Sequence, residues 1–115
     1  MTQQLNLITP GQILWEEFME PLGVSQNKLA RDLDITPARI HDIVHGKRGI
    51  SADTALRFAK YFNTTPEFWL NLQMSYDLRK SRRDCWPQIE SRIRPYTQSS
   101  KNPRGRRGLK NPLVA

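Results

Sequence analysis

Side chains that can hydrogen-bond to nucleic-acid bases and phosphates gather between residues 26 and 48. Arg39 could pair with a guanine or a phosphate, Asp42 could accept from a cytosine, and Ala38 could place its methyl group against a thymine. Phosphate contacts are expected from four polar or basic neighbours, which are Gln26, His45, Lys47 and Arg48. Three further positions could face a groove, and they are Thr36, Pro37 and His41. The pattern indicates a DNA-reading surface, and its alternative is a helical hairpin with a solvated polar face.

The residues that could serve catalysis or bind a metal are few. His41 and His45 have the i,i+4 spacing of a metal-binding pair, but no third ligand stands at a recognisable spacing. Cys85 follows Arg82 and Arg83, which could lower its pKa, but no histidine is placed to pair with it. The acidic residues Glu16, Glu17 and Glu20 suit a solvated surface. We therefore expect no enzyme, no metal, no cofactor and no small-molecule substrate.

Two short helices must position the candidate DNA contacts. Ser25 and Thr36 are of the residue types that cap helix N-termini. Asp34 stands in the tight turn between the helices, where a left-handed conformation is expected, and Gly46 can end the second helix in that conformation. The inward faces are Leu29, Ala30, Leu33, Ile40, Ile43 and Val44. Residues 25–45 thus predict a helix-turn-helix, whose second helix enters the DNA major groove.

The same capping pattern predicts three further helices. The first opens at Thr9 and Pro10 and ends at Gly23, while the fourth opens at Ser51 and ends at Asn63. The apolar stripe expected for the fourth helix is Ala55, Leu56, Ala59 and Phe62. The fifth opens at Thr65 and Pro66. Five short helices with short links predict a compact all-α domain.

The fifth helix is longer and more aromatic than a small core requires. We expect it to run to about Arg83, with a break at Trp86 and Pro87 and a short helix over residues 88–94. The side chains that could cover a partner subunit are Trp69, Met74, Tyr76, Leu78 and Trp86. Alternatively, they close the domain's own core. Both interpretations stay open at the level of sequence.

The 115-residue chain divides by charge into a neutral part and a basic tail. Residues 1–80 hold nine Lys or Arg and nine Asp or Glu, whereas residues 81–115 hold nine Lys or Arg against two Asp or Glu. The expected parts are an arm (1–8), the DNA-binding domain (9–74), a helical extension for dimer contact (75–95) and a disordered basic tail (96–115). The tail could add salt-sensitive affinity for nucleic acid or merely aid solubility.

Cysteine content and hydropathy bear on the compartment. A single cysteine excludes a disulfide within the chain, which is typical of the reducing cytoplasm. No stretch approaches the ~20 apolar residues of a membrane span, and the first ten residues lack the basic and apolar regions of a signal peptide. We therefore expect a cytoplasmic protein with no membrane partner.

The sequence resembles the HigA-type antitoxins of bacterial toxin–antitoxin modules, within the lambda/Cro-repressor-like (XRE) helix-turn-helix family. The stretches that carry the resemblance are residues 9–11 with Leu14, 29–30, 36–37, 43–50, 55–59, 65–73 and 76–78. They span about residues 8–82. The combination of residues 46–49 with 66–73 is the specific part, because the helix-turn-helix alone is common to many repressors. Asp34 departs from the glycine usual in the superfamily, and the segment after Pro95 is outside the family pattern.

The resemblance implies a lambda-repressor-like fold and a homodimer that binds a palindromic operator. The two recognition helices of such a dimer lie about one DNA turn apart, roughly 34 Å. It also implies repression of the protein's own operon and neutralisation of a HigB/RelE-type mRNA-cleaving toxin. The alternative is an orphan transcriptional repressor with no toxin, which would use the same helices.

Overall fold

The computed structural model describes residues 7–97, and these residues form helices and no strand. The prediction of an all-α fold is confirmed. The chain divides into two units after Cys85. Most of the expected N-terminal arm and nearly all of the expected basic tail lie outside the described residues. Among the described residues, no helix combines the length and hydropathy needed to cross a membrane.

The first helical run has three consecutive segments, α1 (Pro10–Ile13), the π-helical η2 (Leu14–Met19) and α2 (Glu20–Leu22). Thr9 caps it, since its side chain accepts a hydrogen bond from the backbone N–H of the third residue along, at 3.1 Å. Pro21 offers no N–H, and just before it the ladder shifts, with the Glu20 N–H bonded to the Trp15 carbonyl. Gly23 ends the run at φ 67°.

The predicted helix-turn-helix is present as α3 (Gln26–Leu33) and α4 (Pro37–Val44). The hydroxyl of Ser25 accepts from the backbone N–H of Lys28 at 3.1 Å, and Thr36 caps α4 in the same way. Asp34 has φ 60° and ψ 46°, the left-handed conformation expected for the turn. Gly46, at φ 74°, follows the end of α4. Local hydrogen bonds and turn chemistry therefore set the ends of both helices.

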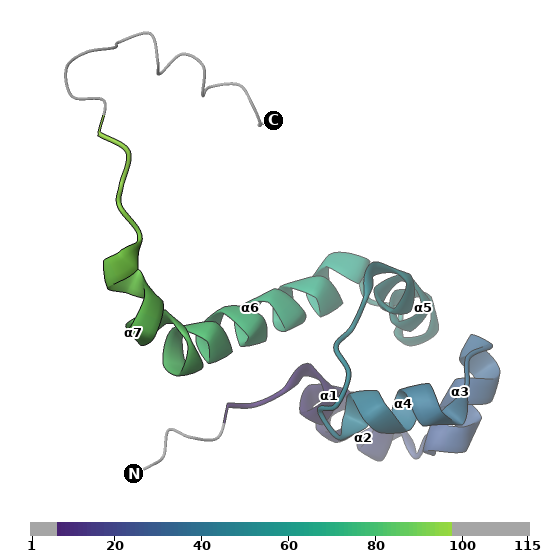
Figure 1. Cartoon of the computed structure of the whole chain (residues 1–115). Coiled ribbons are helices and arrows are strands. Elements are labelled where there is room, and N and C mark those ends of the chain that lie inside the picture. Colours follow the sequence, from purple (N-terminus) through teal and green to yellow (C-terminus); the bar gives the residue numbers. More distant parts are fainter. Residues whose placement is uncertain (1–6, 98–115) are drawn as a thin grey trace, which may run out of the picture. The chain divides into compact units, whose positions relative to one another are not determined.

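The remaining helices of this unit are α5 (Ala52–Phe62) and α6 (Pro66–Asp84). Ser51 and Thr65 cap them, and Asn63 ends α5 at φ 60°, as predicted. Helix α6 is the longest described helix, and Figure 1 shows it extending well beyond the end that adjoins α5. Its end at Asp84 lies close to the expected one.

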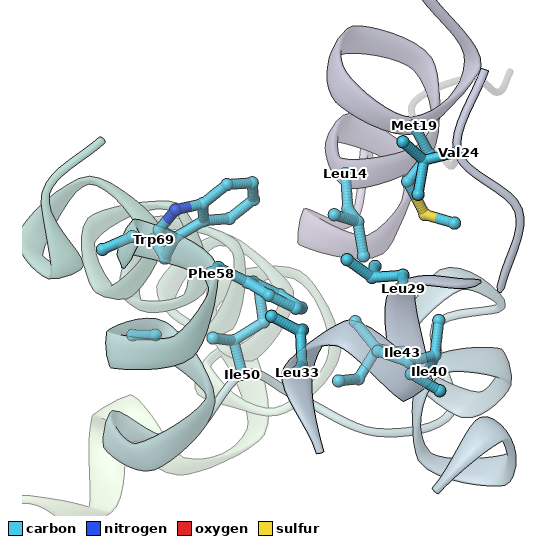
Figure 2. Close-up of a cluster of buried hydrophobic side chains, with 13 residues drawn as sticks. Leu14, Met19, Val24, Leu29, Leu33, Ile40, Ile43, Ile50, Phe58 and Trp69 are labelled. Atoms are coloured by element: carbon cyan, nitrogen blue, oxygen red, sulfur yellow. The ribbon is translucent and has the colours of Figure 1, made fainter. Parts of the chain in front are cut away.

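The core lies between the first helical run, α3, α4, α5 and the first half of α6 (Figure 2). The apolar side chains predicted to face inward on α3 and α4 are buried, except that Val44 is half-buried. One prediction on α5 was wrong, because Leu56 is 60% exposed and Phe58 is fully buried in its place. The buried stripe at Ala55, Phe58 and Ala59 follows i, i+3, i+4 spacing, which Leu56 does not share.

Trp69 closes the core from α6. Its side chain is 0% exposed, and its ring centroid lies 4.9 Å from those of both Phe58 and Phe18. The indole N–H donates to the hydroxyl of Thr64 at 2.7 Å, which satisfies its polar group. The prediction of Trp69 as a dimer contact was therefore wrong, because the chain's own core covers this side chain.

Gly11 permits a close approach between α1 and α4. A Cβ atom at this position would collide with the backbone carbonyl of Ile43, which belongs to a regular helix and cannot move aside cheaply. Gly11 and Ile43 are both buried. The first helical run thus packs against the recognition helix through bare backbone.

The second unit begins with α7 (Trp86–Ile89), followed by a 3₁₀ turn, η3 (Glu90–Arg92). The break predicted at Trp86 and Pro87 lies instead at Cys85, and the helical segment expected over residues 88–94 spans 86–92. Pro87 occupies its first turn, where proline is tolerated because the N–H has no helical partner there. The α6 helix runs without interruption through residues 74 and 75, where the DNA-binding domain was predicted to end.

Candidate nucleic-acid interface

The outer face of α4 carries a row of exposed side chains. Ala38 and His41 are exposed one turn apart, and His45 is exposed just after the helix ends. Thr36 and Pro37 are exposed at the start of the helix, although the Thr36 hydroxyl also caps it. The predicted recognition-helix residues Thr36, Pro37 and His41 are therefore all exposed, as is Ala38.

Arg39 differs from its neighbours on α4 because its guanidinium already has acceptors. Its Nη2 donates to Asp53 Oδ2 at 3.0 Å and to Thr54 Oγ1 at 2.7 Å, both at the start of α5. Only 27% of the side chain is exposed, and Thr54 is buried. Arg39 therefore ties the recognition helix to α5 through its Nη2 group.

Arg57 extends this network to the turn between α3 and α4. Its Nε donates to Asp53 Oδ2 at 3.0 Å, and its Nη1 donates to the carbonyl oxygens of Leu33 at 2.6 Å and Asp34 at 3.2 Å. The Asp53 carboxylate thus accepts from two arginines on two helices. Hydrogen bonds from Arg57 and then Arg39 hold the pKa of Asp53 below its ordinary value of 3.8.

Asp42 is half-buried, and its backbone shapes the loop that follows α4. Its carbonyl oxygen accepts from the N–H groups of Lys47 at 2.8 Å and Arg48 at 3.2 Å. Both basic side chains are exposed. The loop therefore presents two cations directly after the recognition helix, as expected for residues that contact phosphates.

The predicted phosphate contacts Gln26 and His45 line one surface hollow of about 330 Å³. The other residues of this hollow are Gln12, Trp15 and Val44. His45 Nδ1 lies 2.9 Å from the His41 carbonyl oxygen, and the two imidazole centroids are 4.1 Å apart. Lys47 and Arg48 line a different hollow, so the four predicted phosphate contacts form two groups.

A metal site receives no support from the described side chains. His41 and His45 lie next to each other, but nowhere in residues 7–97 do three His, Cys, Asp or Glu side chains gather so that they could hold a metal ion. Cys85 is an exposed free thiol at the end of α6.

A second carboxylate links α3 to α5. Asp32 Oδ2 accepts from Lys28 Nζ at 2.9 Å and from the Tyr61 hydroxyl at 2.8 Å. The hydrogen bond from Lys28, followed by that from Tyr61, lowers the pKa of the Asp32 carboxyl. The same contacts raise the pKa of the Lys28 ammonium and of the Tyr61 hydroxyl. The hydrogen bond from Tyr61 thereby holds α3 to α5, while Lys28 pairs with Asp32 within α3.

The side chains predicted to contact a second subunit have separate locations on α6. Met74 and Leu78 are 61% and 49% exposed. Tyr76 is half-buried and lines the hollow beside Lys47 and Arg48. An exposed apolar pair thus remains on α6, while Tyr76 faces the loop after the recognition helix.

The network around Asp53 and Arg57 was not predicted from the sequence. The i,i+4 spacing of an aspartate and an arginine on α5 is visible in the sequence as an intrahelical ion pair. Their links to Arg39 and to the turn join residues 14 and 24 positions apart, which no local pattern encodes. The i,i+4 spacing could therefore have identified the Asp53–Arg57 ion pair, but not the residues on other elements that it contacts.

Comparison with known proteins agrees with this architecture. The family model described as "Helix-turn-helix" matches residues 16–69. The chain is 46% identical over 81 residues to the virulence-associated protein I of Dichelobacter nodosus, which covers 70% of this chain and 75% of that protein. The residues that the family model matches include α3, α4 and α5.

Two solved structures are similar to the chain. The Pseudomonas aeruginosa antitoxin HigA, solved with the higBA promoter, has a TM-score of 0.76 and 41% identity, covering 80% of this chain and all of that one. An addiction-module antidote protein of the HigA family from Coxiella burnetii has a TM-score of 0.72 and 48% identity, covering 77% and 97%. The family consists of DNA-binding regulators and not of enzymes. The helix-turn-helix geometry and these likenesses together show that the chain belongs to the HigA-type antitoxins of the XRE helix-turn-helix family.

Proposed function

We propose that the protein is a DNA-binding antitoxin that represses its own operon in the bacterial cytoplasm and neutralises a HigB/RelE-type mRNA-cleaving toxin. The observation that carries the DNA-binding part is the exposed outer face of α4, held by α5 and followed by two exposed cations. The Pseudomonas aeruginosa relative solved with promoter DNA supports it. The toxin-neutralising part rests on family membership.

The residues fall into three roles in this proposal. Ala38, Arg39 and Asp42 of α4 read bases, and Arg39 uses N–H groups beyond the Nη2 that is bonded to α5 unless DNA displaces these bonds. Thr36, Pro37 and His41 line the groove beside them. Phosphate contacts come from Gln26, His45, Lys47 and Arg48. Substitution of a base-reading residue should therefore change specificity, and substitution of a phosphate contact should change affinity for all sequences alike.

Two copies associate through Met74 and Leu78 of α6, and the resulting dimer binds a palindromic operator. These side chains are large, apolar and exposed on a long helix, the pattern expected at the core of a subunit contact. The dimer places two α4 helices in successive major grooves, about 34 Å apart. Two-fold symmetry of the protein then requires two-fold symmetry in the operator.

The test of DNA recognition is a fluorescence-anisotropy titration at about 0.15 M salt. The probes are the DNA upstream of the gene and a shuffled duplex of equal length and composition. We expect the upstream DNA to bind at least about 10³-fold more tightly. Ala38→Arg, which places a bulky cation in the groove, should remove most of this preference. Equal binding of the two duplexes by the wild-type protein contradicts sequence-specific repression.

The test of neutralisation uses the reading frame next to the gene. Co-expression of that product with the antitoxin should restore growth that the product alone arrests, and the two proteins should co-purify. The Ala38→Arg variant is the matched control, because it should lose the operator and keep the toxin. Specific DNA binding without a growth-arresting neighbour would favour an orphan repressor.

A further inference from the structure

A second hollow, of about 260 Å³, lies between the start of α1, the loop after α4 and the middle of α6. The loop contributes Lys47 and Arg48, and α6 contributes Tyr76, Asp77 and Lys80. From the sequence alone, the two loop residues are expected to contact phosphates and Tyr76 a second subunit, and Lys80 has no expected role. The structure places them around one space.

The loop and α6 are held in a defined relation. Gln73 Oε1 accepts from the backbone N–H of Ile50 at 2.8 Å, and Gln73 Nε2 donates to Asp77 Oδ1 at 2.9 Å. Gly49 makes room for this contact, because a Cβ there would lie 3.0 Å from the Gln73 amide. The separation between the loop cations and the α6 side chains is therefore fixed by a side chain to backbone hydrogen bond.

The charges around this hollow favour an anion. Lys47, Arg48 and Lys80 carry three positive charges, and Asp77 carries one negative charge, with one of its oxygens bonded to Gln73. The lining thus has a net charge of two positive units. Lys80 Nζ also lies 3.7 Å from Asp84, a long ion pair on an exposed surface that costs little to break. The half-buried Tyr76 adds a hydroxyl donor.

We infer that Tyr76 and Lys80 of α6 join Lys47 and Arg48 in binding one phosphodiester of the DNA backbone. The inference rests on the proposed DNA-binding function, because it places that backbone beside the loop after the recognition helix. A phosphate is the anion that this position meets when α4 enters the groove. Lysine provides the charge and tyrosine a neutral hydrogen bond.

This assignment divides α6 between two partners. Gln73, Tyr76, Asp77 and Lys80 follow i, i+3, i+4, i+7 spacing and share one face, the face that lines the hollow. Met74 and Leu78 lie on a different side of the helix. One helix can therefore contact the DNA backbone with one face while a second copy covers another.

The experiment measures the salt dependence of binding for three lysine variants of the full chain. Lys80→Gln removes the charge, Lys80→Arg keeps it, and Lys60→Gln removes the same charge from the hollow between α3 and α5. Each phosphate contact contributes about 0.9 to the slope of log affinity against log salt. We expect Lys80→Gln to weaken binding and to reduce the slope by less than about 0.9 per subunit, because Lys47 and Arg48 still neutralise the shared phosphate, and the other two variants to keep both.

Specificity provides a second readout. Lys80→Gln should weaken operator and shuffled DNA by the same several-fold factor, because a phosphate carries no sequence information. Tyr76→Phe should weaken both duplexes and leave the slope unchanged, since it removes a hydroxyl and no charge. Thermal unfolding and size-exclusion elution of each variant, equal to those of the wild type, separate these effects from folding and dimerisation.

The outcomes distinguish this inference from the proposed function. An unchanged slope and affinity for Lys80→Gln overturns the contact, even where the wild-type protein prefers its operator. A reduced slope for Lys80→Gln supports the contact even where operator and shuffled DNA bind equally, in which case the sequence-specific function fails alone. A wild-type protein that binds neither duplex overturns both.

Discussion

The helix pair α3–α4 and the second half of α6 differ in what covers their apolar side chains. On α3 and α4 the large aliphatic residues are buried against the other helices of the same chain. On α6 the side chain of Trp69 is buried, but Met74 and Leu78 one and two turns later are exposed. The helix pair is thus covered by its own domain, whereas the second half of α6 leaves apolar side chains exposed.

Length explains part of this difference. Helices of eight residues, such as α3 and α4, are marginal in water, so they depend on tertiary packing and on their caps. Helix α6 has 19 residues, and its packed first half provides the nucleus for the rest. Its second half can therefore be helical without burying its apolar residues in the domain. The surface of this second half does not pack against the domain, so DNA or a second copy can contact it.

The largest expected effect on stability is at the packed end of α6. Trp69→Ala should lower the free energy of unfolding by about 3–5 kcal/mol, because it leaves a cavity among Phe18, Phe58 and Phe62. Met74→Ala on the same helix should change it by no more than about 0.5 kcal/mol for the monomer. Urea denaturation at low protein concentration measures both. Equal losses would show that the two halves of α6 are packed alike.

The second largest effect tests the backbone contact between α1 and α4. Alanine usually stabilises a helix relative to glycine, but Gly11→Ala should lower the free energy of unfolding by about 1–3 kcal/mol through overpacking against Ile43. Gly23→Asn is the control, because it has open space and asparagine tolerates the left-handed conformation. Thermal unfolding followed by circular dichroism compares them. A stabilised Gly11→Ala protein would mean that α1 does not contact α4 so closely.

A smaller effect concerns the arginine network that holds the recognition helix. Because the pKa of folded Asp53 lies below the ordinary value of 3.8, its carboxylate stabilises the fold fully above that value, and this contribution is lost as pH falls through the folded pKa. Asp53→Asn should therefore weaken the fold at pH 6 and reduce the loss on acidification to pH 3. The remaining acid sensitivity reflects other carboxylates with lowered pKa, such as Asp32. Identical pH profiles for the two proteins would contradict this role.

The same network gives a prediction for DNA binding. Arg39→Ala and Asp53→Ala should weaken operator binding by similar factors, and the double variant should lose little more than either, because both remove one contact that positions α4. Anisotropy titrations of the four proteins form the cycle. If Arg39→Ala alone abolishes the sequence preference and Asp53→Ala does not, Arg39 reads a base.

The smallest effect on the fold is expected where the apolar pair is exposed. Met74→Ser combined with Leu78→Ser should leave the monomer's unfolding almost unchanged and shift the protein from dimer to monomer. Sedimentation equilibrium measures the association, and loss of cooperative operator binding should accompany it. The matched control is Leu56→Ser, an equally exposed leucine on α5. A dimer that survives the double change places the subunit contact elsewhere.

The sequence by itself determined where the helices begin and turn. Thr9, Ser25, Thr36, Ser51 and Thr65 each accept from the backbone N–H three residues later, as predicted, and Asp34 and Asn63 take the left-handed conformation expected of them. These features depend on residues within four or five positions, so composition and spacing suffice. The all-α fold and the helix-turn-helix follow from them.

The tertiary structure alone decided which side chains meet across the fold. It buried Phe58 and not Leu56, closed the core with Trp69, joined Arg39 to Asp53, and set Tyr76 and Lys80 beside the loop after α4. These contacts join helices that are far apart in the chain. They depend on how packed helices are rotated and separated relative to one another. The periodicity of a single helix does not determine this rotation. Local hydrogen bonds therefore determine where the helices begin and end, and tertiary packing determines which residues the functional side chains contact.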